Sequence, residues 1–148
     1  MADFTIRPAV KEDFSSVRQL IHAVNINPTG LDWRRFLVAV AAGNEFLGCG
    51  QIKPHGDGSI ELASIAVQED ARGRGIARAV IQELLAQEAR RPVYLMCRAR
   101  LESLYEKFGF RTIDLGEMPR YFKSIGRAER IFNKKAGPLD RLRVMRLD

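Results

Sequence analysis

The segment from Ser64 to Ala77, Ser-Ile-Ala-Val-Gln-Glu-Asp-Ala-Arg-Gly-Arg-Gly-Ile-Ala, constrains the fold more than any other part of the sequence. Its apolar start predicts a strand, and Gly73 and Gly75 predict a tight loop that opens a helix at about Arg74. Such a loop presents unpaired backbone N–H groups and the positive end of the helix dipole, which together suit a diphosphate. The two glycines also let the backbone approach a ligand closely, because neither has a Cβ.

The chain around this loop alternates between strand and helix patterns. Apolar residues recur at intervals of three and four from Glu12 to Val24 and from Ile76 to Leu85, which predicts two amphipathic helices. Further helices are expected over residues 101–107 and 121–135, the second one basic. Apolar runs bounded by turn residues predict strands over residues 5–9, 36–42, 46–53, 59–67, 92–97, 110–115 and 142–147.

The order of these elements predicts the fold class. Turn residues at 43–44 and 55–58 join the middle strands into antiparallel hairpins, whereas helices separate the other strands. A chain of 148 residues has the length of one domain. We therefore expect a single α/β (α+β) domain over residues 1–148, with a mixed, mostly antiparallel central sheet flanked by helices.

Two motifs resemble one enzyme family. The loop spacing Arg72-x-x-Gly75-x-Ala77 is neither a P-loop, which ends in Gly-Lys-Ser/Thr, nor the dinucleotide fingerprint G-x-G-x-x-G. It resembles the acyl-CoA-binding motif Gln/Arg-x-x-Gly-x-Gly/Ala of the GNAT superfamily of N-acetyltransferases. Residues 104–110, Leu-Tyr-Glu-Lys-Phe-Gly-Phe, resemble that family's Tyr-x-x-x-Gly-Phe segment, and residues 4–14 resemble its opening. Nearly the whole chain fits the family's order of strands and helices.

The resemblance implies direct acyl transfer from acetyl-CoA to an amine within a ternary complex, with no metal. In that family, backbone N–H groups of the strand hold the pantetheine arm and polarise the thioester carbonyl, and those of the loop bind the diphosphate. Acetyl is expected as the acyl group because it is the family's most frequent one. The cofactor-binding residues implied here are Ile65, Ala66, Val67, Arg72, Gly73, Arg74, Gly75, Ile76 and Ala77.

Tyr105 is the catalytic acid that the resemblance implies for the departing thiolate. Reference pKa values near 10 for Tyr and near 8.5 for a thiol make full proton transfer uphill by about 2 kcal/mol. A hydrogen bond or a concerted transfer is therefore favoured over a complete prior transfer. The structural alternative is an aromatic residue that closes the sheet.

Glu61 is the candidate base, because many members of that family have a Glu on the corresponding strand. Alternation places it on one strand face with the apolar Ala63, Ile65 and Val67. Direct abstraction from an ammonium would cost about 8 kcal/mol at reference pKa values. Burial that raises the Glu pKa, or a relaying water, would lower this cost. The structural alternative is an exposed carboxylate at a strand start.

The amine acceptor is expected between the first helix-loop region and the late part of the chain. Asp32, Trp33 and Arg34 follow the loop where this fold varies with substrate, and Pro119-Arg120-Tyr121-Phe122 begins the basic region. An aromatic and basic wall favours an acceptor that has a carboxylate or phosphate beside its amine. These residues are equally consistent with core and surface positions.

One position departs from the family pattern. Arg98 stands where the family often has an Asn that contacts the cofactor. Arg98 and the neighbouring Arg100 are compatible with contacts to phosphate or to an acidic acceptor, and equally with capping the sheet edge. Both interpretations stay open.

The excess positive charge lies in the last part of the chain. Residues 118–148, the basic segment, contain nine Lys or Arg and three Asp or Glu, so the whole formal net charge of +6 belongs to them. Such a segment attracts anionic ligands, nucleic acid or membrane lipid, or forms the solvated face of a surface helix. A protein that associates with nucleic acid is therefore one alternative, although nucleic acid is not the expected partner.

Residues with metal-binding chemistry lack the spacing of a metal site. Cys49 and Cys97 lie in apolar strand segments, His22 in a predicted helix and His55 in a turn. A free Cys behaves as a small hydrophobic residue. We therefore expect packing roles for these residues and no metal.

No segment predicts a membrane span or a secretory signal. The longest apolar run, Phe36–Ala42, is much shorter than the roughly 20 residues that a spanning helix requires. The N-terminal residues have an acidic Asp3 and no apolar stretch. A cytoplasmic enzyme is expected, and a catalytically inactive acyl-CoA sensor is a further alternative. The family often pairs through its late strands, so a homodimer is one expected state.

Overall fold

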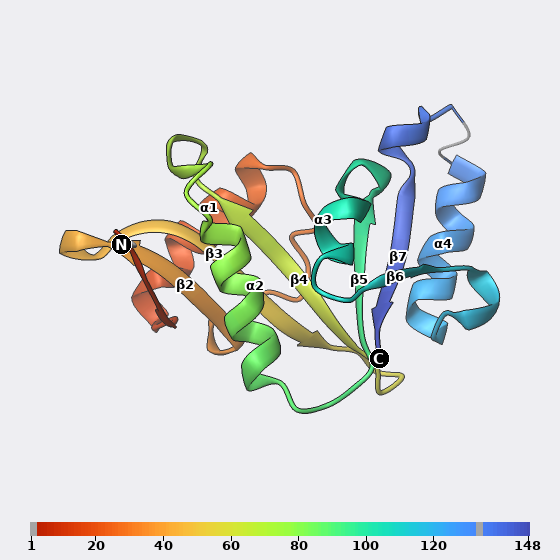
Figure 1. Cartoon of the computed structure of the whole chain (residues 1–148), viewed down its shortest axis with the longest axis horizontal. Helices are drawn as coiled ribbons and strands as arrows, with labels where there is room; N and C mark the ends of the chain where they lie inside the picture. Colours follow the sequence, from red (N-terminus) through yellow and green to blue (C-terminus); the bar gives the residue numbers. More distant parts are fainter. Residues whose placement is uncertain (1–2, 133–134) are drawn as a thin grey trace. The chain divides into compact units, whose positions relative to one another are not determined.

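A computed structural model of the chain describes residues 3–132 and 135–148. Over these residues the strands are β1 (Thr5–Pro8), β2 (Phe36–Ala41), β3 (Glu45–Pro54), β4 (Ile60–Val67), β5 (Val93–Arg98), β6 (Arg111–Ile113) and β7 (Leu142–Leu147). The α-helices are α1 (Phe14–Ala23), α2 (Ile76–Gln87), α3 (Glu102–Glu106) and α4 (Arg120–Phe132). All of them are drawn in Figure 1.

The chain divides into two compact units. Unit 1 contains the residues up to Lys53 together with Leu62–Ala89, and unit 2 contains Pro54–Glu61 and Arg90–Asp148. Strand order in unit 1 is β1-β2-β3-β4, and in unit 2 it is β4-β5-β7-β6, because β4 begins in unit 2 and ends in unit 1. The expectation of a single domain over residues 1–148 stays a prediction.

In unit 1, helices cover both faces of an antiparallel sheet (Figure 1). Cys49 of β3 packs in a core cluster with Val17 and Ile21 of α1. A Cβ added to the next residue, Gly50, would instead meet Val80 of α2 at 2.8 Å. Because consecutive strand residues point to opposite faces, α1 and α2 lie on opposite sides of the sheet.

Two glycines of β3 bring α2 close to the sheet. A Cβ on Gly50 would lie 2.5 Å from Ile65 Cδ1, and a Cβ on Gly48 would lie 2.8 Å from the Ala66 carbonyl oxygen and 3.2 Å from Ile76 Cγ2. Real Cβ atoms do not approach that closely, so only glycine allows this packing. Gly48 and Gly50 therefore set the position of the first turn of α2 against β3 and β4.

In unit 2, the start of β4 runs parallel to β5, with Glu61 opposite Tyr94, and β5 and β6 both pair antiparallel with β7. Helix α4 packs on this sheet through Phe122, which is fully buried with Tyr94, Ile113 and Val144. Burying a Phe side chain stabilises a fold by about 1.5–3 kcal/mol. Phe122 therefore anchors the start of α4.

The predicted fold class is confirmed: the chain has a mixed α/β fold with a mostly antiparallel sheet. Helix α2 begins at Ile76 rather than at Arg74, because Gly75 has the left-handed backbone that ends the loop. Strand β6 is shorter than predicted, and α4 begins at Arg120. The predicted extension of α4 to residue 135 includes residues 133–134, which lie outside the described residues.

Candidate functional site

The glycine loop, residues 72–77, lies at the start of α2 in unit 1. Gly73 and Gly75 have φ values of 84° and 80°, and a Cβ on either would meet no atom within 4 Å. Both positions therefore need glycine because the backbone there is left-handed. This reason is separate from the one given by the sequence, which was the close approach of the backbone to a ligand. Ile76, which is 2% exposed, fixes the helix start to the core.

The backbone of this loop is arranged as a donor surface. The Ala79 N–H donates to the Gly75 carbonyl at 3.0 Å, so the N–H groups of the preceding turn have no acceptor within the helix. The side chains of Arg72 and Arg74 are exposed. Arg72 Nε donates to the Val67 carbonyl at 3.3 Å, and Arg74 forms an ion pair with Asp3 at 3.4 Å. The loop thus combines free helical N–H groups with two cations, which is a suitable environment for an anion.

Strand β4 contains one residue with an unusual backbone conformation, Ser64, just before the predicted pantetheine-binding residues. Ser64 has a φ of 60°, a conformation that few residues other than glycine adopt. The Gln51 side chain donates to Ser64 Oγ at 2.9 Å, and Cys49 Sγ lies 3.6 Å from the Ser64 carbonyl oxygen. Ser64 lies within the stretch from Glu61 to Val67 over which the sequence argument assumed regular alternation. The face of Glu61 on that strand stays a prediction.

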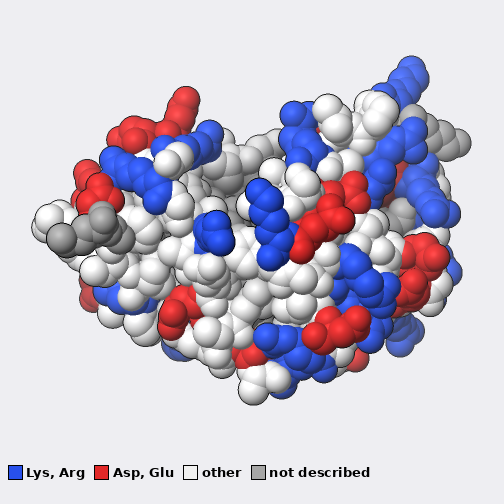
Figure 2. Space-filling view, viewed as in Figure 1, with Lys and Arg blue, Asp and Glu red and all other residues white. Residues whose placement is uncertain are grey.

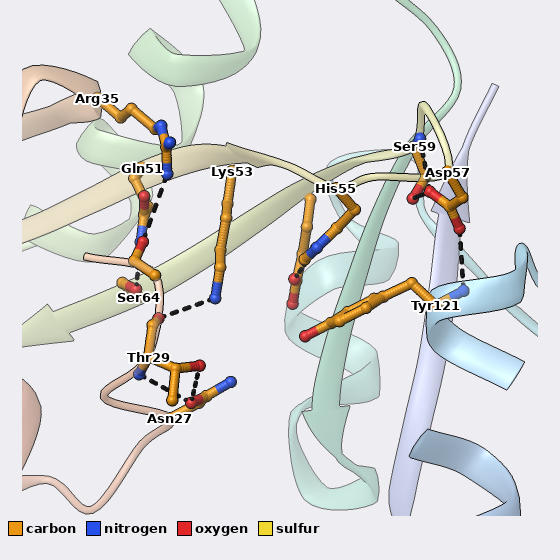
Figure 3. A network of polar contacts seen from close by, with 12 residues as sticks. Asn27, Thr29, Arg35, Gln51, Lys53, His55, Asp57, Ser59, Ser64 and Tyr121 are labelled. Carbon is orange, nitrogen blue, oxygen red and sulfur yellow. Dashed lines mark hydrogen bonds and ion pairs between the residues drawn. The ribbon is translucent and has the colours of Figure 1, made fainter. Parts of the chain in front are cut away.

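Polar groups from β3 and from the loop after α1 gather in unit 1 (Figure 3). Gln51 is completely buried, and its Oε1 atom has no hydrogen-bond partner among the described residues. Lys53, which is 8% exposed, donates from Nζ to the Thr29 carbonyl at 2.9 Å. Arg35 donates to the Gly30 carbonyl at 3.4 Å. Gln51 and Lys53 are thus buried polar groups, and Arg35 is a half-buried cation in the same network, which the sequence did not reveal.

The predicted acceptor residues at 32–34 have a local structural role. Asp32 Oδ1 accepts the Arg34 N–H at 3.0 Å and caps the short 3-10 helix Trp33–Arg35. The Arg34 guanidinium lies 5.1 Å from the centre of the Trp33 ring. Both interactions shape the segment that leads into β2 and positions Arg35.

A second polar cluster lies in unit 2, where the hairpin that joins β3 to β4 meets α4. His55 Nε2 lies 2.7 Å from Glu61 Oε1, and both side chains are 6% exposed. The Tyr121 ring stacks on the His55 ring with centroids 3.6 Å apart, and the Phe122 ring lies edge-on at 5.6 Å. Figure 3 shows His55 and Tyr121 face to face. Glu61 is thus a buried, paired carboxylate, and the alternative of an exposed one is wrong.

Tyr105 lies on α3 in unit 2 and is 9% exposed. Its ring meets the Phe110 ring at 78°, with centroids 6.2 Å apart. The helix ends where Gly109, with a φ of 99°, turns the chain, and the Phe110 N–H donates to the Tyr105 carbonyl at 3.3 Å. Burial raises the pKa of Tyr105 to about 12, so its hydroxyl stays protonated at neutral pH.

One known protein family matches the chain. A model of the acetyltransferase (GNAT) domain family matches residues 32–112, which include the loop, Ser64 and Tyr105. The chain belongs to the GNAT acetyltransferase family. A search of curated proteins finds no match.

Solved structures have the same GNAT fold. N-acetylglutamate synthase from Neisseria gonorrhoeae, complexed with coenzyme A and N-acetyl-glutamate, gives a TM-score of 0.75 at 17% identity. The match covers 100% of the present chain and 36% of the synthase, so the chain spans about a third of that protein. Rv2747 from Mycobacterium tuberculosis, in complex with CoA and NLQ, gives a TM-score of 0.71 at 20% identity, and the match covers 97% of the present chain and 98% of Rv2747. Ard1 from Thermoplasma volcanium gives a TM-score of 0.67 at 17% identity, and the match covers 98% of the present chain and 97% of Ard1.

Arg98, which stands where the GNAT family often has an Asn, has a structural role. Arg98 donates to the Asp140 carbonyl at 3.0 Å and pairs with Glu129 at 3.4 Å, and Arg100 forms an ion pair with the Asp140 carboxylate. Both arginines therefore hold the turn that precedes β7. This supports the interpretation that they cap the sheet edge.

The basic segment is partly neutralised. Two of its cations form ion pairs: Arg143 with Glu102 at 3.4 Å and Arg146 with Asp148 at 2.6 Å. Lys134 lies outside the described residues. Figure 2 shows blue and red side chains interspersed on the visible face. Association with nucleic acid therefore stays an alternative that rests on the sequence alone.

The cysteines and histidines do not come together. Cys49 and Cys97 are both buried, and burial raises the pKa of each thiol to about 12. Within residues 3–132 and 135–148, no group of three or more His, Cys, Asp or Glu side chains could hold a metal ion. No helix in the same part of the chain is long and apolar enough to cross a membrane.

His55 was not predicted from the sequence as a partner of Glu61. The available signal was the predicted hairpin turn at 55–58, because residues that flank a turn lie opposite each other on antiparallel strands. Gln51 and Lys53 were missed for a different reason. Both lie in a strand whose other residues are mostly apolar or Gly, and only the packing of the loop after α1 shows that they are buried.

Proposed function

We propose that this protein is an acetyl-CoA-dependent N-acetyltransferase that transfers acetyl to a primary amine of a small molecule or protein by direct attack in a ternary complex. The observation that carries the proposal is the left-handed pair Gly73 and Gly75 at the start of α2, with unpaired helical N–H groups beside it. The diphosphate of acetyl-CoA is the proposed ligand of these N–H groups. Ile65, Ala66 and Val67 are proposed to bind the pantetheine arm. The CoA complexes of related structures support this choice of cofactor.

Tyr105 is proposed to donate a hydrogen bond to the departing thiolate. With a pKa of about 12 against a thiol near 8.5, complete transfer of its proton is uphill by about 5 kcal/mol. A donated hydrogen bond stabilises the thiolate without that cost. Glu61 is proposed to accept the proton of the amine, because it is a buried carboxylate with a fixed orientation.

The acceptor is proposed to have a carboxylate or phosphate beside its amine. Lys53 and Arg35 support this, because each donates to a backbone carbonyl and has further N–H groups for an anion. The orphan Oε1 of Gln51 is a buried acceptor that an N–H of the substrate could satisfy. A cytoplasmic location and a homodimer remain expectations from the sequence.

Calorimetry with acetyl-CoA and with acetyl-pantetheine, which lacks the diphosphate, tests the cofactor site. Acetyl-CoA should bind at least about tenfold more tightly, and Gly75→Ala should remove most of this difference because a left-handed Ala costs about 1–2 kcal/mol. Gly137→Ala is the matched control, since Gly137 has a φ of −64° and open space around it. Equal binding of the two thioesters would refute the proposed diphosphate site.

Release of free CoA over a panel of amines tests the reaction. The panel should pair each carboxylate-bearing amine with its methyl ester. Lys53→Met should lower kcat/KM for the carboxylates more than for the esters. Tight binding of acetyl-CoA without turnover of any amine would support the alternative of an inactive acyl-CoA sensor.

A further inference from the structure

His55 and Glu61 form a pair that the proposed chemistry has not yet explained. Their hydrogen bond is 2.7 Å long and joins side chains that are each 6% exposed. An ionised carboxylate can only accept hydrogen bonds, so Nε2 is the donor whenever Glu61 is charged. The imidazole thus binds one carboxylate oxygen, Oε1, and fixes the orientation of the carboxylate plane.

The His55 ring is itself held from several sides. The backbone N–H of His55 donates to the Ser59 carbonyl at 2.9 Å, and the backbone carbonyl of His55 accepts the Gly58 N–H at 3.0 Å, so the hairpin turn fixes the main chain that carries the ring. The Tyr121 ring lies parallel to the imidazole within 17°. Asp57, in the same turn, accepts the Tyr121 backbone N–H at 2.9 Å and so fixes that stacked ring. A donor held this firmly is preorganised for its acceptor.

Burial alone would make Glu61 a poor base. Removing a carboxyl from water favours its neutral form, and a protonated carboxyl cannot take a proton from an amine. A hydrogen bond donated to the charged form acts in the opposite direction and keeps the group ionised. His55 Nε2 is such a donor at Glu61.

We propose that His55 is a positioning residue for Glu61: it keeps the buried carboxylate ionised near neutral pH and orients it as the base for the amine. This inference rests on the proposed acetyl transfer and extends it to a residue outside the family motifs. His55 does not touch the reacting atoms in this role. It acts only through the Glu61 carboxylate.

Two neighbouring groups within unit 2 keep a constant charge near neutral pH. Asp57 stays charged because, although burial acts to raise its pKa, hydrogen bonds from Ser59 and Tyr121 lower that pKa overall. Tyr121 stays neutral because burial, and then the charge of Glu61, raise its pKa.

Two variants separate the hydrogen bond from the packing of the ring. His55→Phe keeps an aromatic ring to stack on Tyr121 but removes the donor, whereas His55→Gln removes the ring and keeps an N–H donor. We expect His55→Phe to lower kcat at pH 7 at least about tenfold and to move the acidic limb of the kcat profile upward by about one pH unit, with the KM for acetyl-CoA unchanged. His55→Gln should retain more activity than His55→Phe. The opposite order, with Phe near wild type, would show a packing role and overturn the inference.

Titration of the Glu61 carboxyl carbon by NMR tests the same pair without any turnover. Its midpoint should be higher in His55→Phe than in the wild type by about one pH unit, and His22→Phe, which alters the exposed histidine of α1, should leave it unchanged. A midpoint that does not move in His55→Phe overturns the inference. A wild type that acetylates no amine refutes the proposed function instead, and the titration still decides whether His55 keeps Glu61 ionised.

Discussion

The carboxylate of Asp57 accepts the backbone N–H of Tyr121 at 2.9 Å, across 64 residues of sequence. Tyr121 lies in the first turn of α4, where N–H groups have no helical acceptor. Asp57 therefore caps a helix from a distant hairpin turn, a role that an N-cap residue usually has locally. The same contact holds the Tyr121 ring against His55.

Replacement of Asp57 by Ala should lower the free energy of unfolding by about 1–2 kcal/mol, because the first turn of α4 loses its cap. Urea denaturation followed by circular dichroism measures this. Asp70→Ala is the matched control, since Asp70 is an exposed acid in the described part of the chain and should have little effect. Equal stability of the two variants would contradict the capping role.

Replacement of Gly48 by Ala should weaken both stability and cofactor binding. The new Cβ would lie 2.8 Å from the Ala66 carbonyl oxygen, and a backbone atom of a central strand cannot move cheaply. Overpacking of this kind costs about 1–3 kcal/mol. Thermal unfolding and acetyl-CoA calorimetry should both show the loss, whereas Gly137→Ala, with open space around its Cβ, should behave like the wild type. A Gly48→Ala variant with unchanged affinity would show that the loop does not depend on this close packing.

Replacement of Tyr105 by Phe should lower kcat by about 10- to 100-fold and leave the KM for acetyl-CoA within about twofold. The ring and its contact with Phe110 remain, so only the hydroxyl is lost. Because the pKa of Tyr105 is about 12, any alkaline limb below about pH 11 should persist in Tyr105→Phe. Tyr94→Phe, another loss of a buried hydroxyl, should leave kcat unchanged. Wild-type kcat in Tyr105→Phe would exclude the proposed acid.

Local patterns were sufficient to predict most of the fold. Each predicted helix and strand has a counterpart, because the periodicity of apolar residues follows from which face is buried. The errors lie at ends, as at Ile76, where a left-handed Gly75 delays the helix. The left-handed backbone at Ser64 was also missed, because a positive φ at Ser is imposed by its surroundings and leaves no pattern in the sequence.

The site was predicted less completely than the fold. The glycine loop and Tyr105 belong to short motifs whose residues are close in sequence, and so they were recognisable. The stacking of Tyr121 on His55 joins distant segments and depends on tertiary packing. The same is true of Lys53 and the Thr29 carbonyl, 24 residues apart. Contacts of this kind are what a single sequence does not reveal.

The ion pair between Arg7 and Asp13 should make stability depend on pH in acid. Arg7 donates to both carboxylate oxygens, at 2.7 and 3.0 Å, and the Val10 N–H donates to one of them at 2.7 Å. These bonds, those of Arg7 first, lower the pKa of Asp13 below its usual value. A pKa lowered by folding gives stability that is complete above the unfolded value near 4 and is lost as the pH falls through the folded value.

Asp13→Asn should therefore lower the free energy of unfolding by about 1.5–3 kcal/mol at pH 7, and this difference from the wild type should shrink below about pH 4. Urea denaturation between about pH 3 and 7 measures the difference directly. Asp70→Asn should show a small difference at every pH, because Asp70 is exposed. If the Asp13→Asn difference stayed constant down to about pH 3, the carboxylate charge would contribute nothing. The contact that ties the end of β1 to the start of α1 would then depend on shape and neutral hydrogen bonds alone.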